Sequence, residues 1–153
     1  MKYRIDAITA ITILGFVLFW IHKPIAEMKI DDLSLRGLDG YPINTNHTLL
    51  ILHIGTIDCM SCKRDSQVLM RHHFQNPSIP IIDANILYTA EEELKLSEWK
   101  QTVDLEYTVA IIENPSVVPY PVPTTLVIQP QKITKIFGSL TYEKLIEVTE
   151  QRL

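Results

Sequence analysis

Two residues in this chain have types and spacing suited to covalent chemistry: Cys59 and Cys62, the only cysteines in the sequence. On a helix, residues three apart lie on one turn, so the two sulfur atoms come close enough for a disulfide that closes a very small ring. This spacing favours reversible dithiol–disulfide exchange. A structural disulfide, two inert thiols or half of a metal site are the alternatives. Two cysteines are too few for a disulfide-stapled scaffold or a four-cysteine zinc site.

The sequence around the pair bears on the reactivity of the first cysteine. The pair directly follows an apolar run, residues 48–54, and opens a predicted helix, whose free N–H groups and partial positive charge stabilise a thiolate. Lys63 and Arg64 add positive charge nearby. Asp58 opposes them, because a carboxylate disfavours a second negative charge beside it, although we expect the same side chain to cap the helix.

The elements that must position this pair follow from hydrophobic periodicity and turn residues. Nearly continuous apolar runs predict strands that are covered on both faces. Strands alternating with helices, then an antiparallel pair and a last helix, predict an α/β fold with a mixed central sheet flanked by helices. The predicted strands are 33–35, 42–43, 48–54, 79–85, 108–112, 124–129 and 133–137; the predicted helices are 59–74, 89–103 with Thr89 as cap, and 141–153 with Thr141 as cap.

The start of the chain is a separate apolar segment. Residues 5–21 carry one charge, and as a helix they extend about 25 Å, close to the thickness of a bilayer core. Lys2 and Arg4 precede the segment, which predicts a cytoplasmic N-terminus and an exported remainder. A cleaved signal peptide is the alternative, but the sequence around Pro24 offers no small-x-small cleavage site. We expect an uncleaved membrane anchor at 1–23, a tether at 24–32 and one domain at 33–153.

Composition and charge exclude other classes of protein. With 46% hydrophobic and 21% charged residues, the chain is neither disordered nor a polytopic membrane protein. The formal net charge is −4, and no run of five like charges occurs in the 153 residues. Nucleic-acid-binding domains instead carry clustered positive charge, so we expect no nucleic-acid partner.

Further motifs accompany the cysteine pair. Asp58-Cys59-Met60-Ser61-Cys62 is followed by Lys63-Arg64-Asp65, later by Val122-Pro123-Thr124-Thr125, and then by Gly138-Ser139-Leu140-Thr141-Tyr142-Glu143. In this combination the chain resembles the membrane-anchored, thioredoxin-like thiol–disulfide oxidoreductases of the TlpA and ResA type, which include the cytochrome c maturation thioredoxins. The resemblance covers roughly residues 33–153 and implies a thioredoxin-like fold.

The resemblance also implies a role for each matching residue. Cys59 is the expected nucleophile and Cys62 the resolving thiol. Pro123 matches the family's cis-proline, which packs opposite the disulfide and leaves the backbone of Val122 free to pair with a bound peptide. A trans proline that opens an edge strand is one alternative, and Pro119 or Pro121 in this position instead of Pro123 is another. Asp65 stands where the family commonly keeps a glutamate that accepts the Cys62 proton. A solvated aspartate paired with a lysine or arginine is the alternative for Asp65.

The sequence departs from the family pattern at three places. Asp58 replaces the tryptophan that usually precedes the first cysteine. Met60 and Ser61, between the cysteines, include no proline, and we expect these two residues to contact the substrate and to tune the redox potential. The segment 113–122 is short and proline-rich where relatives usually carry a helical turn, which bears on the substrate groove.

Three histidines have side chains that could handle protons or bind metal. His53, six residues before Cys59, is either a proton-handling residue or a core histidine whose ring bonds to a backbone carbonyl. His72 and His73 end the predicted helix, where we expect them to be solvated. Cysteines and a histidine could bind copper or zinc. Copper-delivery relatives of this fold, however, usually have a C-x-x-x-C spacing, so we expect no metal.

Together these features predict a membrane-tethered, extracytoplasmic thiol–disulfide oxidoreductase. We expect a single-pass protein of the cytoplasmic membrane whose domain, in the periplasm or extracytoplasmic space, reduces disulfides of exported client proteins. Its redox group is the Cys59–Cys62 pair, with no other cofactor. Since two cysteines hold one electron pair, a membrane electron-donor protein is implied as a second partner. A disulfide oxidase or isomerase, or a non-catalytic metal-handling or assembly module on the same fold, is the alternative.

Overall fold

A computed structural model describes residues 30–150 of the chain. Within these residues lie one six-stranded sheet, three α-helices and two single-turn 3-10 helices. The elements are η1 (Ile30–Asp32), β1 (Leu35–Gly37), β2 (Leu50–Gly55), α2 (Met60–Gln75), β3 (Ile81–Ile86), α3 (Ala90–Val103), β4 (Thr108–Ile112), η2 (Pro115–Val117), β5 (Thr124–Gln129), β6 (Lys132–Phe137) and α4 (Tyr142–Glu150).

The sheet is mixed, as predicted. Its strands follow the order β1-β4-β3-β2-β5-β6. β2, β3 and β4 run parallel to one another, whereas β1 pairs with β4, β5 with β2 and β6 with β5 in antiparallel fashion. β2 and β3 lie at the centre and are buried along their whole length, which is why their sequences are nearly continuous apolar runs.

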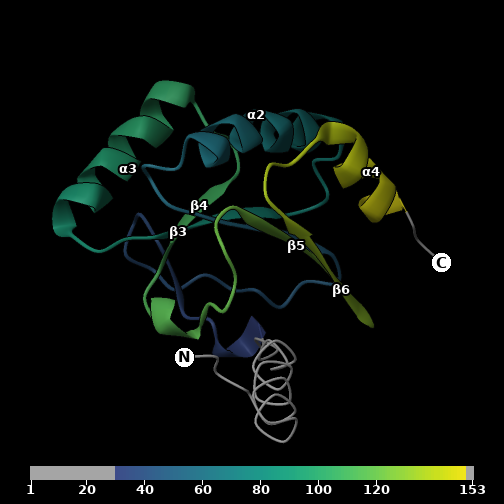
Figure 1. The fold of residues 1–153 in the computed structure, drawn as a ribbon, viewed down its shortest axis with the longest axis horizontal. Helices are drawn as coiled ribbons and strands as arrows, with labels where there is room; N and C mark the ends of the chain where they lie inside the picture. Colours follow the sequence, from purple (N-terminus) through teal and green to yellow (C-terminus); the bar gives the residue numbers. More distant parts are fainter. Residues whose placement is uncertain (1–29, 151–153) are drawn as a thin grey trace, which may run out of the picture.

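All three α-helices cover one face of the sheet (Figure 1). α2 connects β2 to β3 and α3 connects β3 to β4, so both crossovers proceed in the same direction across the sheet. Since such crossovers are right-handed, helices that advance in one direction lie on the same face. η1, η2 and the connecting loops lie over the opposite face (Figure 1).

The core consists of two apolar layers, one on each face of the sheet. The layer under the helices includes Ile51 of β2 and Leu69 of α2. The opposite layer includes Leu50, Leu52 and Ile54 of β2. Successive residues of β2 therefore alternate between the two layers, because side chains along a strand point to opposite faces.

Local capping interactions set the helix boundaries. Thr89 caps α3 in a capping box with Glu92, whose carboxylate accepts a hydrogen bond from the Thr89 N–H at 3.0 Å. The Thr141 hydroxyl accepts from the Lys144 N–H at 3.3 Å at the start of α4. Both predicted caps are thus confirmed. Asp104 ends α3 with a φ of 54°, a left-handed conformation that aspartate tolerates.

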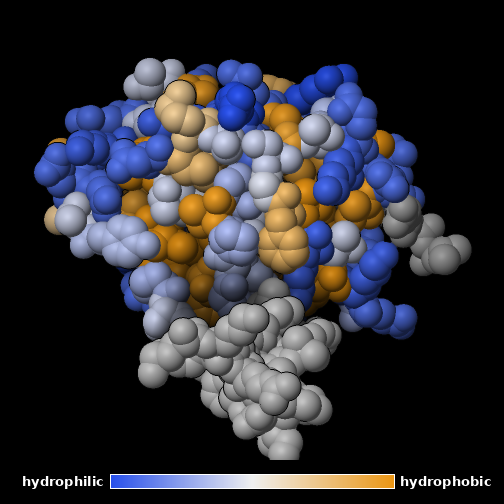
Figure 2. Space-filling model, in the orientation of Figure 1, coloured by the Kyte–Doolittle hydropathy of each residue, from blue (hydrophilic) through white to orange (hydrophobic). Residues whose placement is uncertain are grey.

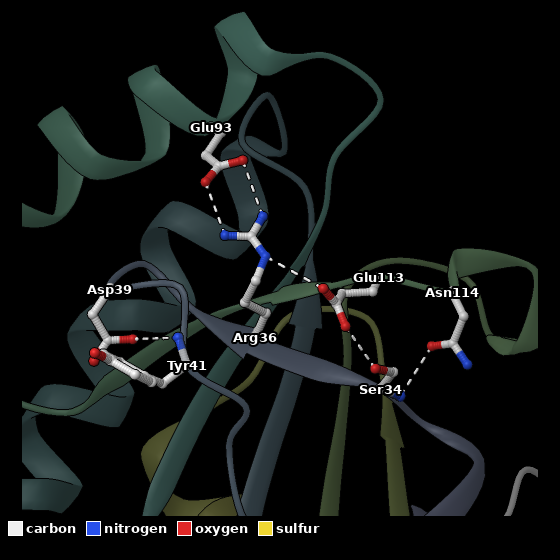
Figure 3. A network of polar contacts seen from close by, with 7 residues as sticks. All are labelled: Ser34, Arg36, Asp39, Tyr41, Glu93, Glu113 and Asn114. Carbon is white, nitrogen blue, oxygen red and sulfur yellow. Dashed lines mark hydrogen bonds and ion pairs between the residues drawn. The ribbon is translucent and has the colours of Figure 1, made fainter.

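A polar network holds the edge strand β1 (Figure 3). Arg36 Nη1 and Nη2 each donate to Glu93 of α3 at 3.1 Å, and Arg36 Nε lies 3.4 Å from Glu113, just after β4. The Ser34 hydroxyl donates to the other oxygen of Glu113 at 2.7 Å, and the Ser34 N–H donates to Asn114 Oδ1 at 3.0 Å. The network thus joins β1, α3 and the end of β4, which are far apart in sequence.

The surface on the side seen in Figure 1 is uneven in character. Hydrophilic residues cover the outer side of α3, whereas hydrophobic residues gather near the centre, between the helix layer and the lower loops (Figure 2). Leu69 of α2 and Leu96 of α3 face the sheet, whereas Met60 and Phe74 of α2 and Leu94 and Val103 of α3 are exposed to solvent.

The N-terminal boundaries are only partly covered by the described residues. The predicted anchor, residues 1–23, lies outside them, and the anchor, tether and domain boundaries stay predictions. No helix between residues 30 and 150 combines the length and apolar composition needed to span a membrane. Of the two short strands predicted before β2, one is β1, whereas Pro42 forms only an isolated bridge with Arg36.

Candidate active site

The cysteine motif lies where β2 leads into α2. Cys59 is the N-cap of α2, with φ −76° and ψ 104°, and its Sγ accepts a hydrogen bond from the Cys62 N–H at 3.1 Å. The prediction that Asp58 caps this helix is wrong. The Cys59 N–H bonds to the Thr56 carbonyl at 3.1 Å, and this turn leaves Asp58 exposed before the cap. The free N–H groups of the helix start therefore face a sulfur atom, where they stabilise a thiolate.

The two sulfur atoms form a disulfide but differ in accessibility. The Cα atoms of Cys59 and Cys62 are 5.2 Å apart. Cys59 is half-buried, whereas Cys62 is only 7% exposed. Since thiol–disulfide exchange requires one sulfur to reach another, Cys59 is the atom through which a partner can react. The greater exposure of Cys59 agrees with its expected role as the nucleophile, and the burial of Cys62 agrees with that of the resolving thiol.

Gly55, the last residue of β2, lets Cys62 approach the sheet closely. A Cβ atom at Gly55 would lie 3.0 Å from Cys62 Sγ and 3.2 Å from Cys62 Cβ, tighter than ordinary van der Waals contact. Any side chain at this position would therefore push α2 away from the sheet or displace the sulfur.

The Val122–Pro123 peptide bond is cis, as predicted. Thr124 at the start of β5 pairs with Ile54 of β2, so Pro123 lies at the end of the sheet where β2 leads into the cysteine motif. Pro123 is buried, and its carbonyl accepts from the Gly138 N–H at 2.9 Å. Val122 is 38% exposed, so its surface is open to another chain.

Apolar side chains at this end of the sheet are exposed to solvent. Met60, between the cysteines, is 70% exposed, and Phe137 is 49% exposed. Phe137 pairs with Thr124 in the sheet, and its ring lies 6.0 Å from that of the buried Tyr120. Ser61 is half-buried, and its hydroxyl accepts from Arg64 at 3.4 Å. Two exposed apolar side chains, Met60 and Phe137, thus lie at the end of the sheet that carries the cysteine motif.

Three buried polar side chains form a row across the sheet on the side that carries α2. They are Thr125 of β5, His53 of β2 and Asp83 of β3, which are register partners. His53 Nδ1 lies 3.0 Å from the Thr125 hydroxyl and not at a backbone carbonyl. His53 Nε2, on the side of Gly55, has no hydrogen-bond partner among the described residues. Burial lowers the pKa of His53 to about 4, so the ring is neutral at pH 7.

Asp83 is a site residue that sequence reasoning missed. It is 3% exposed, and its Oδ1 lies 3.4 Å from the side-chain amide of Asn85. Burial raises the pKa of Asp83 to about 7, and the negative charge of Asp65 acts in the same direction. The signal that identifies it is a carboxylate inside an apolar strand, because burying such a group without a strong partner is costly.

Asp65 lies on the inner side of α2. It is 1% exposed, so the alternative of a solvated aspartate is wrong. Its Oδ1 accepts from the Leu140 N–H at 2.9 Å, whereas Oδ2 has no partner among the described residues. Burial raises the pKa of Asp65, opposed by the Leu140 hydrogen bond and the charge of Arg64. The bond to Leu140 ties α2 to the turn before α4.

Comparison with known proteins gives no matching family model and no matching curated sequence. Solved structures do match. A secreted disulfide oxidoreductase of Mycobacterium tuberculosis, homologous to E. coli DsbE, has a TM-score of 0.66 over 78% of this chain and 95% of its own, at 11% identity. StoA from Bacillus subtilis has a TM-score of 0.63 over 76% of this chain and 94% of its own, at 17% identity. A thiol:disulfide interchange protein of the thioredoxin family from Chlorobium tepidum TLS has a TM-score of 0.62 over 75% of this chain and 88% of its own, at 13% identity.

The chain has a thioredoxin-like fold. Within this thioredoxin-like domain, the proline-rich segment 113–122 does contain a helical turn, η2, which begins with a proline at its first position. Val117 and Val118 pack against the apolar layer on the face opposite the helices. The segment therefore covers the sheet with one 3-10 turn.

The histidines near the end of α2 lie differently from the prediction. His72 is fully buried, its Nε2 is 3.4 Å from the Thr149 hydroxyl of α4, and burial lowers its pKa. His73 is half-buried, with its ring 6.5 Å from that of Tyr107. Solvation of His72 is therefore a wrong prediction, because α4 packs on this end of α2. Among residues 30–150 no group of three or more His, Cys, Asp or Glu side chains is placed to hold a metal ion.

Proposed function

We propose that this protein is a membrane-tethered, extracytoplasmic thiol–disulfide oxidoreductase that reduces disulfides of exported client proteins. One observation carries the proposal: the Cys59–Cys62 disulfide at the start of α2 lies at the same end of the sheet as the cis Val122–Pro123 bond. A reactive pair beside an open backbone segment suits exchange with a second polypeptide. The structural neighbours named as a disulfide oxidoreductase and a thiol:disulfide interchange protein support the same chemistry.

The exchange proceeds in two steps. The Cys59 thiolate attacks one sulfur of the client disulfide, which forms a mixed disulfide and releases the other client sulfur as a thiolate. Cys62 then loses its proton and attacks Cys59 Sγ, which releases the second client thiolate and forms the Cys59–Cys62 disulfide. The client gains the two electrons that the protein loses. The start of α2 stabilises the Cys59 thiolate before the attack.

The client binds at the exposed apolar end of the sheet. Its backbone pairs with that of Val122, and its side chains contact Met60 and Ser61. Met60 is 70% and Val122 38% exposed, so both are accessible to a bound peptide. Pro123, buried beneath, holds this segment in place.

Repeated reduction of client disulfides requires a supply of electrons from a second protein. Each turnover uses the single electron pair of the two thiols, so a membrane electron-donor protein reduces the Cys59–Cys62 disulfide again. Residues 1–23 anchor the chain in the cytoplasmic membrane, and the domain lies on the periplasmic or extracytoplasmic side. The apolar composition of residues 5–21 and the preceding Lys2 and Arg4 support this orientation.

An equilibrium redox titration of the full-length chain tests the function. The chain is equilibrated in thiol–disulfide buffers, and its free thiols are counted by the mass shift on alkylation. A two-electron transition near or below about −250 mV supports a reductant, whereas about −120 to −180 mV supports an oxidase or isomerase. If no reversible Cys59–Cys62 disulfide forms, the oxidoreductase is rejected in favour of a metal-handling or assembly module.

Membrane tethering has a separate test. Membranes from cells that express the full-length chain, or a variant lacking residues 1–23, are washed with alkaline carbonate. The full-length chain should remain in the pellet and the shortened chain should not, because an apolar segment of about 25 Å anchors a protein in the bilayer. Release of the full-length chain by carbonate would contradict the anchor.

A further inference from the structure

A small cavity lies directly beside Cys62. Its volume is about 10 Å³, enough for about one water molecule, and its lining includes Cys62, Lys63, Asp83, Asn85 and Trp99. Cys62 and Asp83 therefore border the same space although they come from α2 and β3. The polar groups of Lys63, Asp83 and Asn85 can supply the two to four hydrogen bonds that a water in such a space requires.

We propose that Asp83 accepts the proton of the Cys62 thiol through one water molecule in this cavity, so that Cys62 can resolve the mixed disulfide. This rests on the proposed function, since only a chain that exchanges disulfides needs a resolving thiol. Asp83 thereby takes the role that the family resemblance implied for Asp65.

The geometry favours Asp83 over Asp65. Asp65 is not among the described residues that line the cavity; its Oδ1 accepts the Leu140 N–H at 2.9 Å, and its unpartnered Oδ2 does not border the space beside Cys62. The Asp83 carboxylate accepts only a long contact of 3.4 Å from the Asn85 side chain within the described part of the chain. It therefore keeps acceptor capacity for a water on the cavity side.

The groups that face Asp83 set its proton affinity. His53 is its register partner on β2, and Lys63 lines the shared cavity. Asp65 of α2 and Tyr107, just before β4, are near enough to interact with it electrostatically. His53 is neutral at pH 7, and the charge of Asp65 opposes a second negative charge. Burial raises the pKa of Asp83 to about 7, which suits a group that takes up and returns a proton near neutral pH.

Protons and electrons balance in the resolving step. In the mixed disulfide, the Cys62 S–H bond breaks, its electron pair stays on sulfur, and the proton passes through the water to an oxygen of Asp83. Cys62 Sγ then bonds to Cys59 Sγ, and the bond from Cys59 to the client sulfur breaks, with its electron pair leaving on the client thiolate. Asp83 gives its proton to that thiolate or to solvent. When a donor dithiol reduces the protein, the sequence reverses and Asp83 protonates the Cys62 thiolate.

Stopped-flow exchange with a chromogenic disulfide separates the two steps. The reduced full-length chain is mixed with one equivalent of 5,5′-dithiobis(2-nitrobenzoate). The first thionitrobenzoate anion leaves when Cys59 attacks the reagent, and the second leaves when Cys62 resolves the mixed disulfide. The absorbance of the anion, followed across the neutral pH range, gives a rate constant for each phase.

Asp83→Asn keeps the shape of the side chain and removes the proton acceptor. We expect it to slow the second phase about 10²-fold at pH 7, the lower end of what general base catalysis contributes, and to leave the first phase unchanged. The wild-type second phase should rise with pH through an inflection that the variant lacks. Asp104→Asn, the same change at an exposed helix end, should leave both phases unchanged. If the second phase of Asp83→Asn has the same rate and pH profile as that of the wild type, the proposal is overturned.

A second measurement needs no variant. The ¹³C resonance of the Asp83 carboxyl is titrated in the full-length wild type, oxidised and reduced. The two titration curves should differ, because Cys62 carries a thiol beside the cavity only in the reduced state; identical curves overturn the proposal. If the wild type releases only one anion for each chain, no resolution occurs and the proposed function fails as well. If the wild type releases both anions in two phases and Asp83→Asn does so at the same rates, only the role of Asp83 is rejected and the proposed function stands.

Discussion

Replacing Asp83 by asparagine should make the folded protein more stable at neutral and alkaline pH. The pKa of this carboxyl rises from its ordinary value of 3.8 to about 7 in the folded chain, because burial penalises its charge. A difference of about 3 pKa units, at about 1.4 kcal/mol for each unit, corresponds to about 4 kcal/mol of unfolding free energy. The variant that slows exchange is therefore expected to be the more stable protein.

The direction in which the unfolding free energy changes with pH follows from the number of protons that the folded and unfolded chains bind. Below about pH 4, Asp83 is protonated in both states and imposes no penalty. Between about pH 4 and 7, only the unfolded chain loses the proton, so the folded state loses about 1.4 kcal/mol of stability for each pH unit. Above about pH 7, the group is ionised in both states, and the penalty stays at its full value. Asp83→Asn removes this penalty, so its advantage grows from about pH 4 to 7 and then levels off.

Chemical unfolding of the oxidised full-length chain, followed by far-UV circular dichroism in one detergent, measures the difference. Unfolding free energies of wild type and Asp83→Asn are compared at several pH values between about 4 and 8. The difference isolates Asp83, because His53 and the other titrating groups are common to both proteins. Asp104→Asn should match the wild type throughout. A difference that is constant with pH would refute the reasoning, because Asp83 would then titrate alike in folded and unfolded chains.

Three further substitutions test the buried row, the edge strand and the sulfur contact. Burial lowers the pKa of His53 from 6.5 to about 4, so protonation of this ring alone should take about 3 kcal/mol from the unfolding free energy of the wild type as the pH falls across that range, against the gain from Asp83. His53→Leu lacks this loss, so its unfolding free energy should rise relative to that of the wild type as the pH falls; a difference that does not change with pH would contradict the burial argument. Arg36→Ala should lower the unfolding free energy by about 1 kcal/mol, and less in high salt, because Arg36 holds two carboxylates. Lys95→Ala breaks an exposed pair and should have a smaller effect; equal effects would contradict a special role for Arg36. Gly55→Ala should slow the resolving step and cost about 1–3 kcal/mol in unfolding, because its Cβ would press on Cys62; wild-type kinetics and stability would contradict the close contact.

Much of the scaffold was predictable because neighbours in sequence determine it. The apolar run at 48–54 and the Thr89 cap act within their own segments, and β2 and α3 begin and end within a few residues of the predicted ranges. The cis bond before Pro123 was predictable from the family resemblance of Val122-Pro123-Thr124-Thr125, whereas the low cost of a cis bond to proline does not by itself distinguish Pro123 from the other prolines.

The remaining features depend on contacts between distant segments. Asp83 gains its neighbours only when β3 aligns with β2 so that it lies beside His53, and no local pattern encodes that register. His72 becomes buried only because Thr149, 77 residues later, packs on it from α4. Asp58 is not the cap because α2 begins at Met60, one residue later than predicted, after a turn in which the Cys59 N–H bonds to the Thr56 carbonyl.

The alternation of β2 between two layers limits how the length of this chain can change during evolution. Leu50 and Ile54 face the layer under the loops, whereas His53 and Gly55 face the helix that carries the disulfide. One inserted or deleted residue within β2 would exchange these faces, since the side-chain period of a strand is two. Leucine would then replace histidine under the sulfur atoms, and a bulky side chain would replace the glycine that touches Cys62. Descendants of this chain should therefore vary in length in connections such as residues 38–49 and keep β2 at constant length.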